Sequence, residues 1–188
     1  MSGGFDISAF RSQLTGDMAR PTQFYAQFTS PIDNSGYLQV PFRVAATQLP
    51  SFIVEPANVS YFGRTIPLAG DRTFKPWTTM VYNDEDFIIR NALEGWSNSM
   101  NALKSNVRQL PTSSYTLYEG TGSVTQFSKT GVPIRTYEFS GIWPSVVGDI
   151  DVDWSQSNKV EMFQVTWLYN WFEVVSPTIT GIPAPGSF

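Results

Sequence analysis

The strongest constraint on the fold is a run of strictly alternating side chains near the C-terminal end. Within residues 159–172, one face carries Phe163, Val165, Trp167, Tyr169 and Trp171, and the other carries Met162, Gln164, Thr166, Leu168 and Asn170. A period of two over this length is typical of a β-strand with one buried face. Similar but shorter patterns predict further strands at residues 22–29, 37–44, 73–82, 123–127 and 135–143.

Two segments follow the helical period instead. Residues 6–14 predict a short helix, with Asp6 as its cap and Ile7, Phe10 and Leu14 on one face. Residues 83–103 predict the one long helix. For this helix we expect Asn83 to be the N-cap, since Asn is a preferred residue there and acidic residues follow in the first turn. An apolar stripe then runs through the helix along Ile88 or Ile89, Ala92, Leu93, Trp96, Met100 and Leu103.

The remaining segments carry weaker signals. Residues 22–29 and 37–44 flank a turn cluster and predict a hairpin, in which Pro41 marks an edge or a bulge. Residues 45–70 contain three prolines and indicate only short β-like pieces at 51–54, 58–62 and 65–68. A polar loop is expected at 105–114. The predicted organisation is an N-terminal arm with a short helix (1–21), a β domain (22–173) and a C-terminal extension (174–188). The fold class is mainly β, a sandwich or barrel with one flanking α-helix.

Composition excludes several classes of function. The 188 residues contain neither Cys nor His, which excludes disulfide frameworks, Cys/His zinc sites and His-based triads. The net charge of −4 disfavours tight binding of nucleic acid, because such binding depends on Lys and Arg. Charged residues make up only 15% of the chain, which suggests surface covered by oligomerisation. No segment is apolar for long enough to span a membrane, and no secretory signal opens the chain, so synthesis and folding in a cytoplasm are expected.

Candidate chemical sites are weak. Asp149, Asp151 and Asp153 have the spacing that opens a calcium loop, but Trp154 and Val160 stand where that loop needs Gly and an acid. The alternative is a solvated strand with one acidic face. Sixteen acidic residues also allow an acid-pair hydrolase, and the aromatic residues allow a carbohydrate-binding module. Their alternation favours core packing instead, and Trp143 and Trp154 are interpreted in the same way. No catalytic residue, metal or cofactor is predicted.

Two longer motifs carry a resemblance to a known family. The first is AGDRTF (69–74), followed by WT (77–78) and NDE (83–85). The second is GIWPSVVG (141–148), followed by DW (153–154), FQVT (163–166) and WFE (171–173). Together with MARP (18–21) and TQLP (47–50), they resemble the tail tube proteins of contractile-tailed bacteriophages over residues 10–173. Tube initiators of baseplates and tubes of extracellular contractile injection systems share the fold of that family and remain alternatives.

The resemblance implies a structural virion protein and no enzyme. Its expected assembly is a hexameric ring, stacked into a tube inside a sheath, with about four strands per subunit lining an inter-subunit β-barrel. The implied partners are the sheath protein, the baseplate or tube initiator, a tape measure protein in the lumen, and DNA that passes without sequence-specific binding.

Two groups of residues follow as candidates for this assembly. A conduit for DNA must not hold phosphate, so carboxylates are expected along the channel or at ring junctions. The candidates are Glu138, Asp149, Asp151, Asp153 and Glu161, each of which could equally face solvent outside. Gly70, Asp71 and Arg72 are expected in a loop before a strand. Arg72 would form a charge-assisted hydrogen bond either across a junction between subunits or rings, or within that loop.

Overall fold

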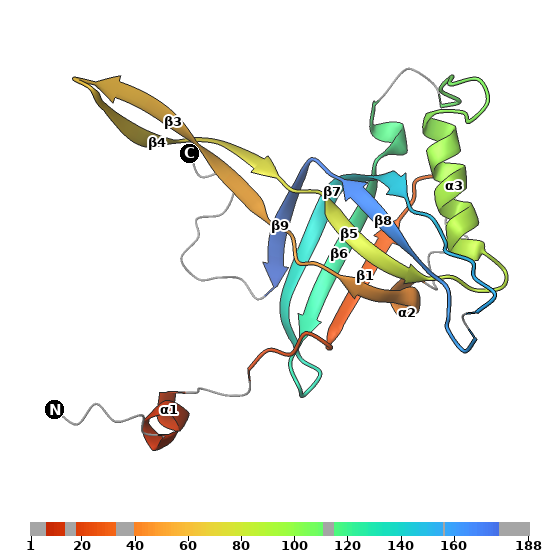
Figure 1. Cartoon of the computed structure of the whole chain (residues 1–188), viewed down its shortest axis with the longest axis horizontal. Helices are drawn as coiled ribbons and strands as arrows, with labels where there is room; N and C mark the ends of the chain where they lie inside the picture. The colour runs from red at the N-terminus through yellow and green to blue at the C-terminus, as the bar shows by residue number, and fades with distance from the viewer. Residues whose placement is uncertain (1–6, 14–17, 33–39, 111–114, 156, 177–188) are drawn as a thin grey trace.

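The chain folds into a β-sandwich from which a long hairpin projects (Figure 1). The computed structural model describes residues 7–13, 18–32, 40–110, 115–155 and 157–176. Its helices are α1 (Ile7–Gln13), α2 (Val40–Arg43), α3 (Ile88–Met100) and the 3-10 turn η1 (Tyr115–Tyr118). Its strands are β1 (Phe24–Thr29), β2 (Val44–Thr47), β3 (Phe52–Tyr61), β4 (Arg64–Phe74), β5 (Trp77–Tyr82), β6 (Gly120–Phe127), β7 (Pro133–Val147), β8 (Met162–Leu168) and β9 (Trp171–Ser176).

The body consists of two antiparallel sheets that share the long strand β7. Sheet A is formed by β1, β6, the first half of β7, and β9. Sheet B is formed by the second half of β7, β8, β5 and β2. The halves of β7 meet at Gly141, which has a φ of 68° and interrupts the pairing register with β6. Strands β3 and β4 pair only with each other among the described residues.

Large aromatic side chains fill the space between the sheets. The ring of Trp77 on β5 stacks on Phe139 of β7, with centroids 4.5 Å apart, and lies 5.9 Å from the ring of Trp167 on β8. The indole of Trp167 donates a hydrogen bond of 3.0 Å to the buried Thr79 hydroxyl. The Trp167 ring is therefore buried while its indole N–H keeps a hydrogen-bond partner.

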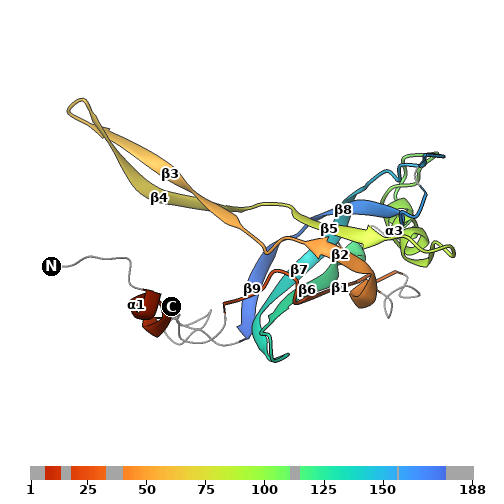
Figure 2. The same cartoon turned by 60° about the horizontal axis from the view of Figure 1, so that its bottom comes forward.

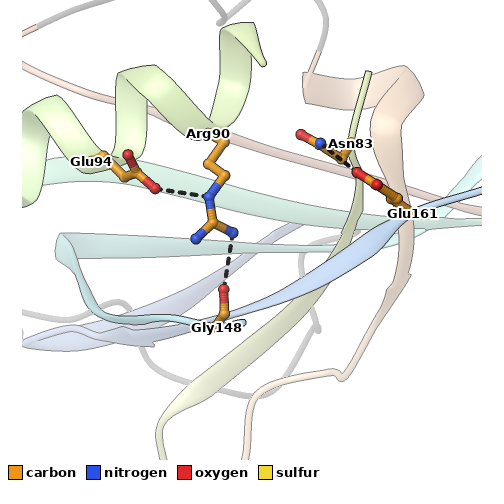
Figure 3. Close-up of polar contacts among 5 residues, drawn as sticks. All are labelled: Asn83, Arg90, Glu94, Gly148 and Glu161. Carbon is orange, nitrogen blue, oxygen red and sulfur yellow. Dashed lines mark hydrogen bonds and ion pairs between the residues drawn. The ribbon is translucent and has the colours of Figure 1, made fainter. Parts of the chain in front are cut away.

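Helix α3 packs its apolar stripe against this core. Ile89, Leu93 and Trp96 are buried, and the indole of Trp96 donates a hydrogen bond of 2.8 Å to the carbonyl of Tyr118. On the solvent side, the Arg90 guanidinium bonds to Glu94 and to the carbonyl of Gly148 (Figure 3). The stripe predicted from the sequence is thus confirmed, except that Leu103 lies beyond the helix and is exposed. Within the described residues, no helix combines the length and the hydropathy needed to cross a membrane.

Several expected elements are confirmed with shifted ends. Helix α1 matches the short helix expected near the N-terminus, although Asp6 and Leu14 lie outside the described residues. Strands β1, β5, β6 and β7 match four of the predicted strands. The described part of the polar loop, up to residue 110, contains no helix or strand.

The predicted hairpin of residues 22–29 and 37–44 is wrong. Strand β1 pairs with β6, and Val40–Arg43 forms the short helix α2. Pro41 lies in the first turn of that helix, where the missing N–H of proline does no harm. Residues 33–39 of the expected turn and strand lie outside the described residues.

The start of the long helix also differs from the prediction. The helix begins at Ile88, and Phe87, with a φ of 53°, occupies the N-cap position. Asn83 instead bonds twice to Glu161 on the neighbouring chain segment, through its backbone N–H and through its side-chain amide (Figure 3). The Asn83 side chain, for which local propensity predicts a capping role, is therefore bound by a residue that is distant in the sequence.

The single strand expected over residues 159–172 is two strands. Phe163, Val165 and Trp167 are buried on β8 as predicted, but the chain turns at Tyr169 and Asn170. Trp171 begins β9 and is half exposed. The alternation of the sequence continues through the turn, so periodicity alone could not locate it.

Two glycines, Gly120 at the contact of β6 with α3 and Gly95 on the exposed side of α3, provide a matched test of packing. A Cβ at Gly120 would collide with the carbonyl of Thr29 and approach the Trp96 ring to 2.7 Å, whereas a Cβ at Gly95 on α3 meets nothing within 4 Å. We expect Gly120→Ala to destabilise the protein and Gly95→Ala to stabilise it by about 0.5–1 kcal/mol. Urea unfolding of the unassembled chain measures both. Equal effects of the two substitutions would contradict the described packing.

Candidate functional site

The face of sheet A that points away from the core carries mainly polar side chains. The pairing register arranges them in three rows that run across β1, β6, β7 and β9. The first row is Thr29, Thr121, Ser140 and Trp171; the second is Gln27, Ser123, Glu138 and Glu173; the third begins with Tyr25, Thr125 and Thr136. We call this surface the polar wall.

The polar wall contains a shallow depression and is acidic. Its middle forms a shallow depression of about 400 Å³, lined by residues of all four strands, including Glu138 and Glu173. These two glutamates lie directly opposite each other on β7 and β9. Like charges in that position destabilise an isolated sheet, so neither fold stability nor strand pairing accounts for the pair.

The polar wall carries no cationic side chain from its own strands. The only Lys or Arg in the four strands of sheet A is Arg135. Arg135 lies an even number of residues before Phe139 of the core, so it belongs to the core-side face of β7 and not to the polar wall. Its guanidinium lies 5.1 Å from the centre of the Tyr137 ring. The surface therefore offers hydroxyl, amide and carboxylate groups and repels anions weakly.

A second exposed surface is the arm formed by β3 and β4 (Figure 2). Every residue of β3, and every residue of β4 except Phe74, is exposed. Phe62 and Gly63 make its tip, both with positive φ, as a two-residue hairpin turn requires. Apolar side chains lie along its whole length, at Phe52, Ile53, Val54, Val59, Tyr61, Phe62, Ile66 and Leu68. An exposed apolar surface of this extent is typical of a protein interface.

Gly70, Asp71 and Arg72 lie within the arm. The prediction that they form a loop is wrong, because all three belong to β4. A Cβ at Gly70 would lie 2.6 Å from the carbonyl of Glu55, where the register of β3 and β4 shifts, so the close approach requires glycine. The Arg72 guanidinium lies 4.4 Å from the centre of the Phe52 ring. Their predicted role at a junction between subunits stays a prediction.

The other predicted carboxylates lie away from the polar wall. Asp149, Asp151 and Asp153 lie in the loop between β7 and β8, not on a strand. The Asp153 carboxylate accepts bonds from the backbone and hydroxyl of Ser155, and Glu161 bonds to Asn83. Among the described residues, no three carboxylates come together in a way that could hold a metal ion.

The predicted core position of Trp154 is wrong. Its side chain is fully exposed, while Trp143 is half-buried. Trp154 borders a hollow of about 460 Å³ with Met80 and Met162, which lie on the outer face of sheet B. The sequence could not separate these tryptophans, because an aromatic side chain in a loop has no periodicity to follow.

The fold alone defines a class. Chains of known contractile injection machines share it: one in the anti-feeding prophage baseplate has a TM-score of 0.63 and 11% identity, covering 86% of this chain and 97% of that chain. One in the sheath-tube complex of the extracellular contractile injection system PVC has a TM-score of 0.59 and 10% identity, covering 92% and 99%. The fold is therefore one that chains of these assemblies share.

The sequence comparison is more specific. The family model "Phage tail tube protein" matches residues 9–175. The tail tube proteins gp19 of Enterobacteria phages T4 and T6 are each 32% identical to the chain over 164 residues, covering 87% of this chain and 96% of each relative. The chain belongs to the phage tail tube protein family. It is a structural component of the virion of a contractile-tailed phage, as the sequence motifs indicated.

The base of the arm gives a pH-dependent prediction. The Tyr169 hydroxyl donates a hydrogen bond of 2.8 Å to the carbonyl of Lys75, between β4 and β5, and burial raises the pKa of Tyr169 from 10.0 to about 12. The folded state then favours the neutral hydroxyl. This contribution to stability is fully present below pH 10.0 and declines as the pH rises towards about 12. We expect Tyr169→Phe to remove that decline.

Urea unfolding between pH 9 and about 11.5, compared for the wild type and Tyr169→Phe, measures it. Tyr82→Phe, at an exposed tyrosine, is the control. Parallel pH profiles for the wild type and Tyr169→Phe would contradict the assignment.

Proposed function

We propose that six copies of the chain close into a ring with the polar wall facing inward. The rings stack into the inner tube of a contractile tail, through which DNA leaves the virion. The observation that carries this proposal is the polar wall: a hollow, four-stranded surface with the Glu138–Glu173 pair and no cation from its own strands. The role is structural, without catalysis.

The dimensions of such a ring fit a DNA conduit. Six copies of a four-stranded sheet give about 24 strands, which at ~4.8 Å spacing and ~40° tilt close into a barrel of roughly 45–50 Å. Side chains reduce the lumen to roughly 35–40 Å, wide enough for a DNA duplex. Before ejection, a tape measure protein occupies the same lumen.

The charge of the polar wall suits passage instead of binding. DNA binds proteins mainly through Lys and Arg, which release counterions from the phosphates. Hydroxyl groups and carboxylates do not bind the phosphates tightly, so they do not hold the DNA in the channel. In this arrangement Glu138 lines the channel together with Glu173, which the sequence motifs did not single out as acidic lining. Asp149, Asp151, Asp153 and Glu161 then stand at ring junctions or on the outer surface.

The outer surface combines apolar and acidic side chains. On sheet B the half-buried Met80 and the exposed Met162 lie beside Trp154, with the acidic loop next to them. We assign this side to contacts with the sheath, and the ends of the tube to the baseplate or tube initiator. Assembly takes place in the host cytoplasm.

The likeness in fold to injection-system chains supports a second candidate, the tube of an extracellular contractile injection system. The higher sequence identity to phage tail tube proteins favours the phage tail. Electron microscopy of the purified protein tests either form of the proposal: six-fold rings and hollow tubes are expected. Compact monomers at every concentration would overturn it.

Reversing the charge of the polar wall should slow the passage of DNA through the tube. In phage carrying Glu138→Lys together with Glu173→Lys, we expect tubes of normal length but roughly tenfold slower DNA ejection, because the new cations bind phosphate. The slowing should weaken as salt is raised. The readout is ejection kinetics from purified virions triggered in vitro.

The control for this experiment carries a single reversal of the same kind outside the proposed channel. Glu85→Lys lies in the exposed turn before α3. Normal ejection from the double variant, or equal slowing in Glu85→Lys, would contradict the position of the polar wall.

The arm should act in assembly and not in folding. Arg72 lies on an exposed ribbon, so Arg72→Ala should leave the unfolding free energy nearly unchanged, within about 0.5 kcal/mol. We expect it to shorten the tubes, because it removes the charge beside Phe52 on a surface proposed to contact another copy. Tube lengths in negative-stain images measure the effect. Tubes as long as those of the wild type would contradict it.

A further inference from the structure

The tip of the arm carries aromatic side chains that the hairpin itself does not need. Phe62 and Gly63 form the two-residue turn, both with positive φ. Asn and Gly adopt this conformation at low cost, whereas a bulky aromatic residue is strained there. Phe62 is nevertheless 90% exposed, and the ring of Tyr61, a residue that is 67% exposed, lies 4.6 Å from the Phe62 ring. Two exposed rings at a strained turn are typical of a binding surface.

The outer half of the arm has one apolar face that ends in a cation. The register of β3 and β4 places Val59 opposite Ile66 and Tyr61 opposite Arg64, and these four side chains share one face. The polar residues that alternate with them lie on the other face: Asn58, Ser60 and Thr65. Arg64 is the only charged residue in the segment 57–68. Because a two-stranded ribbon is marginally stable alone in water, a partner surface over the apolar face would stabilise the arm.

The hollow beside Trp154, which we call the Trp154 hollow, has matching chemistry. Its apolar lining is formed by Met80, Val152, Trp154, Val160 and Met162, and its charged lining by Asp151, Asp153, Lys159 and Glu161. Three carboxylates face a single ammonium group, so the hollow is acidic. Its volume of about 460 Å³ is in the range of protein sites that enclose a ligand. The Trp154 side chain is fully exposed, so it does not serve the packing of its own copy.

Each part of the tip finds a partner group in the Trp154 hollow. An aromatic ring such as that of Phe62 packs favourably on an indole and on methionine sulfur, and the hollow offers Trp154, Met80 and Met162. A guanidinium such as that of Arg64 binds carboxylates by charge-assisted hydrogen bonds and also stacks on the face of an indole. The tip is aromatic and cationic, and the hollow is apolar and acidic. The two surfaces are therefore complementary in both hydropathy and charge.

The two complementary surfaces lie too far apart to meet within one copy. In both overall views the turn between β3 and β4 lies at one end of the molecule, and the loop between β7 and β8 lies at the other (Figures 1 and 2). The tip therefore reaches a Trp154 hollow only on another copy. Because the two surfaces differ, the contact is heterologous and repeats from each copy to the next.

From these observations we propose that the arm tip of one copy inserts into the Trp154 hollow of another copy. The Phe62 ring lies against Trp154, and the Arg64 guanidinium pairs with Asp151 or Asp153. This contact rests on the proposed function, in which the arm meets another copy, and it names the surface that receives the tip. The sheath then contacts the outer surface around a hollow that is already filled.

The absence of cysteine from the sequence makes the contact testable by disulfide trapping. Phe62→Cys is combined with Val152→Cys in one chain, and the assembled protein is oxidised mildly and run on denaturing gels without reductant. Covalent multimers are expected, because the proposed contact brings the two Cβ atoms together. In the control, Phe62→Cys is combined with Val132→Cys, at an exposed valine in the turn between β6 and β7. This pair should give roughly tenfold less cross-linked protein.

A charge exchange tests the polar half of the contact and leaves Phe62 unchanged. Arg64→Glu should reduce the yield of tubes about tenfold, because it places a carboxylate among those of the hollow. Asp151→Arg and Asp153→Arg, each made alone, should reduce it through repulsion of Arg64. Combining Arg64→Glu with Asp151→Arg or with Asp153→Arg should restore the yield to within about threefold of the wild type, since the pair is then re-formed with its charges exchanged. Tube yield is counted in negative-stain images.

The possible failures are distinguishable. Rings or tubes in the microscope without cross-links between positions 62 and 152, or with equal cross-links between 62 and 132, overturn the contact and leave the proposed function intact. Losses that add up in both charge-exchanged chains, without recovery in either, also overturn it. Failure of the wild-type chain itself to form rings overturns the proposed function. Multimers that end at six copies place the contact within a ring, and longer ladders place it between rings; either result supports it.

Discussion

The molecule depends on one strand that belongs to two sheets. The first half of β7 pairs with β6 and β9, and its second half pairs with β8. The change occurs at Gly141, where a positive φ and a bulge bring Ile142 into the core in place of Trp143. A Cβ at Gly141 would collide with the Asn170 side chain, whose backbone N–H bonds to Ser140. Without this bend, sheet A and sheet B would not face each other.

The same bend explains why the polar wall can consist mainly of polar side chains. The rings of Trp77, Phe139 and Trp167 hold the two sheets together from the inside. The opposite face of sheet A then contributes little to stability and is free to carry hydroxyls and even two opposed glutamates. In strand pairing such a glutamate pair is unfavourable, but solvent screens it on an exposed surface. Core packing and the proposed channel chemistry thus reside on opposite faces of the same strands.

The sequence predicted this core better than it predicted the surfaces. The alternation of Phe163, Val165 and Trp167 and the stripe of α3 are local consequences of burial, so periodicity found them. The arm was predicted only as short β-like pieces at 51–54, 58–62 and 65–68, which lie almost wholly within β3 and β4. Its two continuous strands were missed because both of its faces are exposed, which leaves no alternation in burial, and because Pro56 and Pro67 argue against inner strands. Those prolines are compatible with a two-stranded ribbon, in which each strand has a free edge.

The prediction of candidate site residues has the same limit, because local patterns do not give long-range contacts. Glu138 could be placed on the outer face of a strand from its alternation with Phe139, and the structure puts it on the polar wall. Its neighbour Glu173 could not be paired with it, because β7 and β9 are separated in the sequence by β8 and its flanking loops, and periodicity does not give the register between strands that are distant in sequence. Local propensity predicts Asn83 as an N-cap, but its side-chain amide donates a hydrogen bond to Glu161, which lies far along the chain. Contacts over long sequence separation decide these positions.

The surfaces that a single copy leaves uncovered are consistent with the proposed ring. Within the described residues, sheet A has two edges without a strand partner, and the exposed apolar arm extends on the same side as one of them. In the proposed ring, an incomplete assembly always leaves one edge of each kind open, and only the last step of closure covers both. The proposed ring would therefore be favoured over every incomplete assembly, and the low share of charged residues, 15% of the chain, suits a protein that is proposed to act as an assembled copy.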